Sequence, residues 1–349
     1  MKIVHIESGL GNQMLSYCEY IAIKKMNPQE DIYIENIIYD IPECNDIICQ
    51  WNGYELERIF RIKAANIKDQ FSQEKWDNIM NEIHQSEFWN KNWNWPVYFS
   101  KAFINAGLNI KNIRGDFETK TFNIEKGLIN HIRKIIRNTY IGTHIKRLNN
   151  KLRSSSYIKE NDHKKELFLQ TTDNILTGQW LSFKFKGNNR HLIDDEIKNT
   201  FIFPDFTDEK NINMKNFLET VNGVAIHARR GDMLDGLGAY YKYGYFKRAV
   251  KHIRKHVENP VFVFFTNPGS ITWCKENAKV FGLDYKKDKV YFVDWNTGES
   301  SYRDMQLMGY CKHAIITSST FGWWGAYFIK NPNKITISPL VEIDTTMHC

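Results

Sequence analysis

The sequence lacks the long apolar segments that would place a protein in a membrane or send it out of the cell. Its longest wholly apolar run extends only from Val261 to Phe265, far short of the ~20 residues that a membrane-spanning helix needs. Lys2 is followed by His5, Glu7 and a glycine-rich loop, in place of the apolar core and cleavage site of a secretory signal. We therefore expect a cytoplasmic protein.

Familiar metal-binding and catalytic signatures are missing as well. There is no G-x-x-x-x-G-K-[ST] phosphate loop, no H-E-x-x-H zinc motif and no G-x-S-x-G nucleophile elbow. Nor is there an Asp-x-Asp pair, which many sugar-nucleotide enzymes use to hold a divalent cation. The 6 cysteines form no C-x-x-C pair and have no histidines at metal spacing, which predicts free thiols: Cys18, Cys44, Cys49, Cys274, Cys311 and Cys349. If this protein neutralises phosphate charge, arginine must do it.

The composition indicates a globular protein of two ordinary domains. The chain has 349 residues, of which 42% are hydrophobic, 25% charged and 14% aromatic. A formal charge of +7 favours anionic partners, which include nucleic acid, a membrane surface and a phosphorylated substrate. No recognisable nucleic-acid-binding module accompanies this charge.

The second half of the chain shows the most regular pattern. Short apolar segments alternate with helical periodicity, which predicts a parallel sheet in a Rossmann-like domain. Such sheets bind ligands beyond the carboxyl ends of their strands. The polar stretch 205–213 is the expected boundary between domains 1–212 and 213–349. The expected strands are 224–228, 261–265, 290–293, 314–317 and 335–338, and the expected helices are 245–257, 270–280, 302–311 and 321–329.

The first half opens as a βαβ unit and then becomes less regular. We expect a strand at 2–7, a turn at 8–11 and a second strand at 31–35. Between the turn and the second strand we expect a helix, because apolar residues recur there at helical spacing: Met14, Tyr17, Cys18 and Ile21. The tryptophan-rich segment 89–96 either lines an acceptor groove or caps a core. The basic segment 125–153 either sits on anionic lipid or forms a solvated helical face.

Two clusters fall at predicted strand ends in the second half. His227, Arg229 and Arg230 leave one buried strand, with Gly231 and Asp232 directly after them. A guanidinium is a planar bidentate clamp for a diphosphate, although a salt-bridge cluster is the structural alternative. After the strand expected at 314–317, three hydroxyl residues lie where a helix begins: Ser318, Ser319 and Thr320. Such a helix start suits a phosphate, whereas an ordinary helix cap would explain only one hydroxyl.

Two further features have competing interpretations. Asp304 follows Ser301 at the spacing of a helix capping box, so it either caps a helix or contacts a ligand. The loop at Gly9 and Gly11 stands between strand and helix like a dinucleotide fingerprint, but Met14 replaces the third glycine. An oxidoreductase using nicotinamide is therefore disfavoured, and a backbone loop facing a cleft is the alternative. A non-catalytic glycan-binding protein is suggested by the tryptophans.

Taken together, three segments resemble the bacterial α1,2-fucosyltransferases of glycosyltransferase family 11. They are 9–14 (GLGNQM), 227–232 (HARRGD) and 318–326 (SSTFGWWGA), with a fainter match at 178–182 (GQWLS). The chain departs from the family pattern at Asn267-Pro268, where relatives commonly carry acidic residues, and at Gly322, where serine is frequent.

The resemblance implies a GT-B-like pair of Rossmann-like domains facing a cleft, with the carboxyl-terminal domain binding GDP-β-L-fucose. It also implies a terminal β-galactoside as acceptor, inversion at the anomeric carbon, no metal or other cofactor, and surface-polysaccharide (O-antigen) assembly with acceptors that can be lipid-linked at the inner membrane. By this analogy Arg229 grips the donor β-phosphate, helped by Arg230. The other expected donor contacts are His227 and Asp304 to guanine, Ser318, Ser319 and Thr320 to the diphosphate, and the loop residues Gly9, Gly11, Asn12 and Gln13.

The reaction also needs a base for the acceptor hydroxyl, unless the leaving phosphate takes the proton. Asp232 is the first candidate and Asp235 the second. Either carboxylate can instead orient the arginines.

Overall fold

The structure is a computed structural model that describes residues 1–47, 52–91, 95–110, 175–176, 193–230, 239–267 and 269–339. Two compact units divide the chain, with the boundary between Ile202 and Phe203. The sequence places this boundary after residue 212. Helix α10 (Glu209–Thr220) contacts strand and helix elements of the second unit, so the structural boundary comes before this helix.

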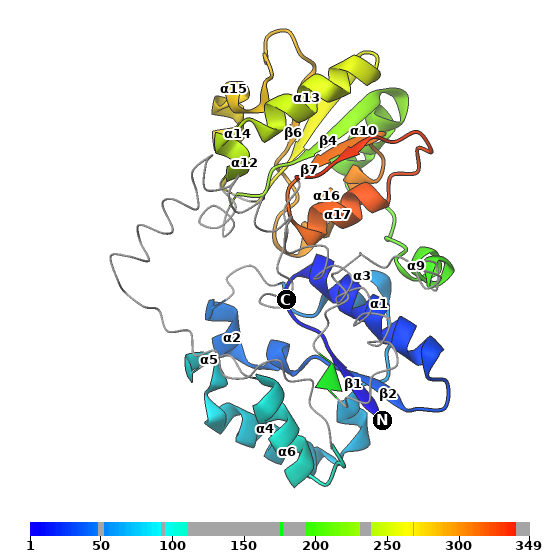
Figure 1. The fold of residues 1–349 in the computed structure, drawn as a ribbon, viewed down its shortest axis with the longest axis vertical. Helices are drawn as coiled ribbons and strands as arrows, with labels where there is room; N and C mark the ends of the chain where they lie inside the picture. The colour runs from blue at the N-terminus through cyan, green and yellow to red at the C-terminus, as the bar shows by residue number, and fades with distance from the viewer. Residues whose placement is uncertain are drawn as a thin grey trace, which may run out of the picture. The chain divides into compact units, whose positions relative to one another are not determined.

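The first unit contains the βαβ opening that the sequence predicts. Strand β1 (Lys2–His5), helix α1 (Leu10–Met26) and strand β2 (Ile32–Glu35) follow one another, and α1 contacts both strands (Figure 1). A short strand, β3 (Ile175–Leu176), completes a parallel sheet in the order β2-β1-β3. The remaining described elements are η1 (Ile37–Asp40), α2 (Pro42–Ile47), α3 (Glu55–Phe60), η2 (Ile67–Gln70), α4 (Gln73–Ser86), α5 (Phe88–Lys91), α6 (Trp95–Asn105) and α9 (Asp194–Thr200).

The tryptophan-rich segment contributes to the core of this unit. Trp95 is 4% exposed and belongs to the same buried cluster as Phe88, Phe99 and Ile3. Trp89 packs against this cluster as a partly buried side chain, while residues 92–94 lie outside the described part. For Trp95 the core interpretation is therefore confirmed.

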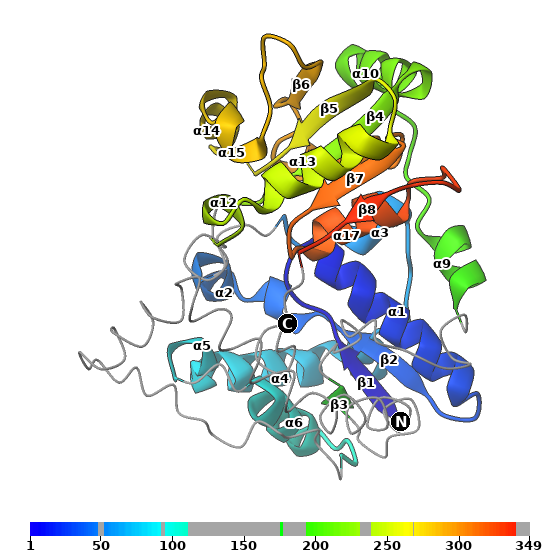
Figure 2. The same ribbon diagram turned by 45° about the horizontal axis from the view of Figure 1, so that its top comes forward.

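The second unit is the Rossmann-like sheet that the sequence predicts, and the α/β class is confirmed. Five parallel strands run in the order β6-β5-β4-β7-β8, and Figure 2 shows α13 lying across one face of them. The strands are β4 (Asn222–His227), β5 (Pro260–Phe265), β6 (Val290–Val293), β7 (His313–Ile316) and β8 (Thr336–Ile337). The other elements are α12 (Ala239–Lys242), α13 (Tyr245–His256), α14 (Ile271–Glu276), α15 (Ala278–Phe281), η6 (Gly298–Ser300), α16 (Tyr302–Met308) and α17 (Thr320–Tyr327).

Both faces of this sheet are buried, which explains why its central strands are apolar throughout. Val261 to Phe265 alternate between two hydrophobic cores, one on each face. The predicted stripe on α13 is confirmed, because Phe246, Ala249, Val250 and Ile253 are all buried. The single helix expected at 270–280 is instead two helices, α14 and α15. They break at Asn277, whose side-chain amide donates to the Trp273 carbonyl at 2.8 Å and competes with the helical backbone.

The register of the sheet brings four strand ends to one edge. His227 pairs with Phe265 on one side and with Ile316 on the other, and Phe265 pairs in turn with Val293. The residues that follow β4, β5, β6 and β7 therefore leave the sheet side by side, as the ligand-binding rule for such sheets requires.

The structure bears on the expectations about the cysteines and about membrane-spanning helices. Cys18, Cys44, Cys274 and Cys311 are buried free thiols, as predicted. The basic segment 125–153 and the faint motif at 178–182 lie outside the described residues. Within the described ranges, no helix combines the length and the apolar character needed to span a bilayer.

Candidate functional site

Polar atoms without partners gather at the carboxyl edge of the second sheet. Within the described part of the chain, four buried polar atoms here have no hydrogen-bond partner: Nδ1 of His227 at the end of β4, Nε of Arg230 shortly after it, and Oγ1 of Thr317 and Oγ of Ser319 after β7. Leaving such an atom unpaired costs ~1–3 kcal/mol each, so folded proteins keep few of them. Four at one sheet edge indicate groups that are available to a polar ligand.

The imidazole of His227 is neutral at physiological pH. Burial and the nearby positive charge of Arg229 lower its pKa from 6.5 to about 3. The ring stacks on Phe321 with centroids 5.7 Å apart. The ring also lies close to Gly322, where an added Cβ would be 2.5 Å from Nδ1. A neutral ring held this rigidly suits hydrogen bonding to a heterocyclic base better than it suits charge pairing with a phosphate.

The two neighbouring arginines have different surroundings. The Arg230 guanidinium carbon lies 3.4 Å from the ring centroid of Trp273 and 5.6 Å from that of Tyr241. The Arg230 backbone N–H donates to Asn267 Oδ1 at 3.0 Å, and Tyr241 donates its hydroxyl to the Arg229 carbonyl at 2.8 Å. These aromatic rings fix the position of the Arg230 guanidinium, whose Nε atom has no hydrogen bond to any residue that the structure describes.

The hydroxyl cluster lies at the start of α17, as the sequence predicts. Ser319 is the N-cap residue, yet its side chain makes no capping hydrogen bond. Ser318 Oγ and Tyr240 Oη hydrogen-bond at 2.6 Å, and Thr320 is the first helical residue. A helix start with an uncommitted N-cap hydroxyl offers both backbone N–H groups and a side chain to an anion. Behind it Trp324 is completely buried, which confirms that at least one of the two tryptophans is core.

The sequence that builds this edge also carries the family signal. Residues 122–347 match the sequence profile of glycosyl transferase family 11, and this range contains β4, β7 and all of the strand-end residues described above. The match spans more than half of the chain. The protein belongs to glycosyltransferase family 11.

Individual relatives of this family-11 chain cover smaller parts of it. An α-1,2-colitosyltransferase of Escherichia coli is 31% identical over 166 residues, which are 44% of this chain and 53% of that protein. A galactoside α-(1,2)-fucosyltransferase 1 of Saimiri sciureus is 35% identical over 109 residues, which are 30% of this chain and 28% of that protein. The alignments thus span about half of the first relative, or less for the second. The crystal structure of fucosyltransferase NodZ from Bradyrhizobium aligns over 93% of this chain and 90% of that chain with 12% identity and a TM-score of 0.43.

Asp304 is not part of a helix capping box, so that interpretation of the sequence is wrong. Ser301 makes no capping hydrogen bond, and the capping box present here joins Thr297 and Ser300 one turn earlier. Asp304 is 7% exposed, and its Oδ1 accepts a hydrogen bond from Asn296 Nδ2 at 2.8 Å. Burial raises the Asp304 pKa from 3.8 to about 8, although the bond from Asn296 opposes the change. A carboxyl group with so perturbed a pKa is a candidate for ligand contact.

The loop after β1 belongs to the first unit and is tightly organised. Gly9 is the N-cap of α1, with open space where a Cβ would lie, and Gly11 and Asn12 are already helical. The Gln13 amide donates to the carbonyls of Ser8 at 2.9 Å and Gly53 at 3.0 Å, and its oxygen accepts the Glu55 N–H at 2.8 Å. Since all these hydrogen bonds go to backbone groups, the side chain of Gln13 holds the loop together and has little left for a ligand.

The two predicted bases cannot be placed, because Asp232 and Asp235 lie outside the described residues, as does Gly231. Among the residues that the structure describes, no group of three or more His, Cys, Asp or Glu side chains is arranged to hold a metal ion. The sequence did not single out the aromatic supports Tyr240, Tyr241 and Trp273, although three tyrosines between 240 and 243 are an unusual local density.

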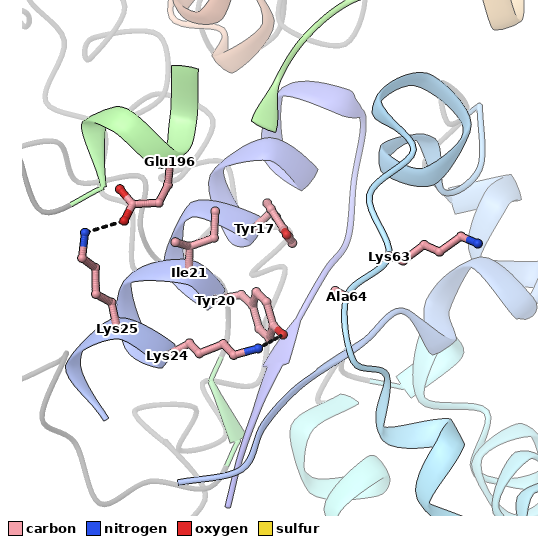
Figure 3. A pocket seen from close by; sticks show the side chains of 8 residues that line it. All are labelled: Tyr17, Tyr20, Ile21, Lys24, Lys25, Lys63, Ala64 and Glu196. Atoms are coloured by element: carbon pink, nitrogen blue, oxygen red, sulfur yellow. Dashed lines mark hydrogen bonds and ion pairs between the residues drawn. The ribbon is translucent and has the colours of Figure 1, made fainter. Parts of the chain in front are cut away.

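A pocket of about 360 Å³ lies elsewhere, in the first unit (Figure 3). Helix α1 provides much of its wall, and Lys25 forms an ion pair with Glu196 of α9 across it. Lys24 donates to the Tyr20 hydroxyl at 3.4 Å. The residues that line this pocket include none of those predicted for the donor site. Two of its three lysines, Lys24 and Lys25, already have partners. The strand-end edge of the second unit is the stronger candidate for chemistry.

Proposed function

We propose that this protein is an inverting α1,2-fucosyltransferase that moves L-fucose from GDP-β-L-fucose to the 2-hydroxyl of a terminal β-galactoside. The observation that carries the proposal is the set of buried, unpaired polar atoms after β4 and β7, in a chain of family 11. The proposal is also supported by two relatives whose names describe α1,2 transfer.

Each residue of the edge has a role in this proposal. The neutral His227 ring and the carboxylate of Asp304 bind the guanine, because a base edge offers both donors and acceptors. Arg229 and the helix start at Ser318, Ser319 and Thr320 bind the diphosphate. Arg230, stacked on Trp273, supports the backbone from which Arg229 extends.

Catalysis then comes mainly from electrostatics. As the bond between the fucose anomeric carbon and the β-phosphate oxygen breaks, GDP keeps the electron pair and gains negative charge, while the ring becomes oxocarbenium-like. A positioned cation that meets this charge is typically worth ~3–4 kcal/mol. The acceptor oxygen forms the new bond from the opposite face, which inverts the configuration. Its proton passes to a base.

A second donor sugar is a specific alternative. One of the relatives described above is a colitosyltransferase. Colitose is fucose without its 3-hydroxyl. A site that hydrogen-bonds this hydroxyl would discriminate against colitose, whereas an apolar wall there would accept both. GDP-fucose and GDP-colitose should therefore be compared directly.

The decisive experiment measures GDP release from GDP-fucose with and without lactose in the presence of EDTA, with the product linkage read by NMR. We expect acceptor-dependent release and an α1,2-linked product, with no need for metal. Donor binding without release for any galactoside would refute the acceptor class. Glycan binding without nucleotide binding would favour a non-catalytic glycan-binding protein, and a thermal shift with NAD alone would favour an oxidoreductase. A lipid-linked acceptor at the inner membrane is a further part of the proposal, which a lipid-diphosphate galactoside would test.

A further inference from the structure

Asp304 lies at one end of a chain of buried hydrogen bonds within the second unit. Its Oδ1 atom accepts from Nδ2 of Asn296, which lies in the loop that leaves the carboxyl end of β6. Asn296 is paired in turn with Asn211 of α10. The exposed fraction is 1% for Asn211, 8% for Asn296 and 7% for Asp304. Polar groups buried this deeply depend on one another for their hydrogen bonds.

The two asparagines form a reciprocal amide pair. Nδ2 of Asn211 donates to Oδ1 of Asn296 at 2.8 Å, and Nδ2 of Asn296 donates back to Oδ1 of Asn211 at 3.0 Å. Nδ2 of Asn296 also donates to Asp304 Oδ1 at 2.8 Å. An asparagine amide has two N–H donors. Asn296 therefore uses both, one for Asn211 and one for Asp304.

Two further neighbours decide how the amide of Asn211 is oriented. Oδ2 of Asp208 accepts from Asn211 Nδ2 at 2.8 Å, and Trp295 Nε1 donates to Asn211 Oδ1 at 2.9 Å. Burial would raise the pKa of Asp208, but the hydrogen bonds from Asn211 outweigh it and lower this pKa. An ionised carboxylate can only accept, and an indole N–H can only donate. The amide of Asn211 therefore cannot be reversed without losing both bonds.

The orientation of Asn211 fixes the rest of the chain. Asn296 must turn its oxygen toward the Asn211 amide N–H, so its own N–H groups face Asn211 and Asp304. Oδ1 of Asp304 consequently meets a donor, and any proton on this carboxyl group belongs on Oδ2. Burial raises the pKa of Asp304, and the hydrogen bond from Asn296 opposes the change, as expected for a donor that stabilises the ionised form.

A carboxylate held in this way distinguishes between purines. Guanine presents two neighbouring N–H donors on one edge, whereas adenine presents one donor beside an acceptor nitrogen. An ionised carboxylate accepts from guanine and repels the acceptor nitrogen of adenine. Resting on the proposed function, in which Asp304 binds guanine, we propose that Asn296 and Asn211 are positioning residues that hold Asp304 for guanine and against adenine. They act through Asp304, because their own amide N–H groups are all committed within the chain of hydrogen bonds.

The test compares GDP with ADP, which share the ribose and the diphosphate and differ in the base. Asn296→Ala removes the N–H group that orients Asp304. We expect its GDP dissociation constant, measured by calorimetry, to rise about tenfold, the scale of one hydrogen bond to a charged group, with no rise for ADP. The matched control is Asn331→Ala. Asn331 is a partly buried residue that donates to the Lys312 carbonyl at 3.1 Å, at the amino end of β7, and its loss should change neither constant.

A double-mutant cycle separates positioning from a loss of structure. If Asn296 acts through Asp304, Asn296→Ala should weaken GDP binding about tenfold in the wild-type background and less than about twofold in Asp304→Ala. If the melting temperature shows that Asn296→Ala does not fold, Asn211→Ala provides the second test. It leaves Asn296 in place without its support, and GDP binding should weaken while ADP binding does not.

The possible outcomes separate this inference from the proposed function. Equal losses for GDP and ADP, or equal losses with and without Asp304, would show that the asparagines support the fold alone and would refute the inference. GDP binding by Asn296→Ala within about twofold of wild type would refute it as well. Wild-type GDP affinity in Asp304→Ala would instead overturn the contact of Asp304 with guanine, and this inference with it. Failure of the wild-type protein to bind GDP at all would overturn the donor of the proposed function.

Discussion

Replacement of Asp304 by Asn gives the sharpest test of the second-unit site, because Asp304 links stability to donor binding through one proton. Its pKa rises from 3.8 to about 8 on folding, mainly because the carboxyl group is buried. Between these two values the native state keeps a proton that the unfolded chain has lost. Stability must therefore fall as the pH rises through this window and level off above about pH 8.

The size of the effect follows from the shift. Each unit of pKa change corresponds to ~1.4 kcal/mol, so wild type should lose up to about 1.4 kcal/mol per pH unit relative to Asp304→Asn. Between about pH 5.5 and 8 this amounts to ~3 kcal/mol. Urea unfolding followed by tryptophan fluorescence measures the difference. Asp294→Asn is the matched control, because Asp294 is an exposed carboxylate paired with Lys275.

Donor binding should change in the opposite direction. Guanine offers N–H donors that only an ionised carboxylate accepts fully, so GDP binding must displace the proton from Asp304. GDP affinity should rise with pH, by up to ~tenfold per unit between about pH 6.5 and 8, and Asp304→Asn should bind weakly at every pH. Calorimetry measures both. A wild-type GDP affinity that stays constant over this interval, or parallel stability curves for wild type and variant, would refute the reasoning.

Three further changes test the edge around β4 and β7. Arg229→Ala should lower kcat/KM ~10²–10³-fold and weaken GDP-fucose binding. The control Arg254→Ala, which removes an exposed ion pair with Asp288, should leave both unchanged. Near-normal turnover of Arg229→Ala would refute the phosphate role of Arg229. Thr317→Val replaces a buried hydroxyl without a hydrogen bond by a methyl group. The melting temperature without ligand should therefore rise, while GDP binding should weaken. An unchanged GDP affinity would show that this hydroxyl does not contact GDP. In an ordinary helix Gly322→Ala would stabilise the fold by ~1 kcal/mol, but here the added methyl group meets His227. We therefore expect overpacking to destabilise the protein by ~1–3 kcal/mol and to lower its GDP affinity. A variant more stable than wild type would contradict the close contact.

Much of the second unit could be predicted because its signals are local. Five apolar segments bounded by helices specify five strands, and parallel crossovers bring their carboxyl ends to one edge, so the sequence alone predicts that His227 and Ser319 lie at the same edge. The break at Asn277 was missed, since a side chain that captures a backbone carbonyl leaves no periodic trace.

The first unit was harder to predict because its important contacts are long-range. Nothing in the sequence near His5 announces that Glu35 and Trp95 will enclose it, since these residues come from separate elements and meet only on folding.

The sequence by itself determined the α/β class, the family and the position of His227 and Ser319 at one sheet edge, because periodicity and motif spacing can be recognised without knowledge of contacts. Tertiary structure decided which of those residues are free to act. It committed the Gln13 amide to backbone groups and stacked the Arg230 guanidinium on Trp273. Among the residues that the structure describes, it left polar atoms of His227, Arg230, Thr317 and Ser319 without hydrogen bonds. The physical reason is that burial and pairing, which set the pKa of Asp304, depend on neighbours that only the folded chain supplies.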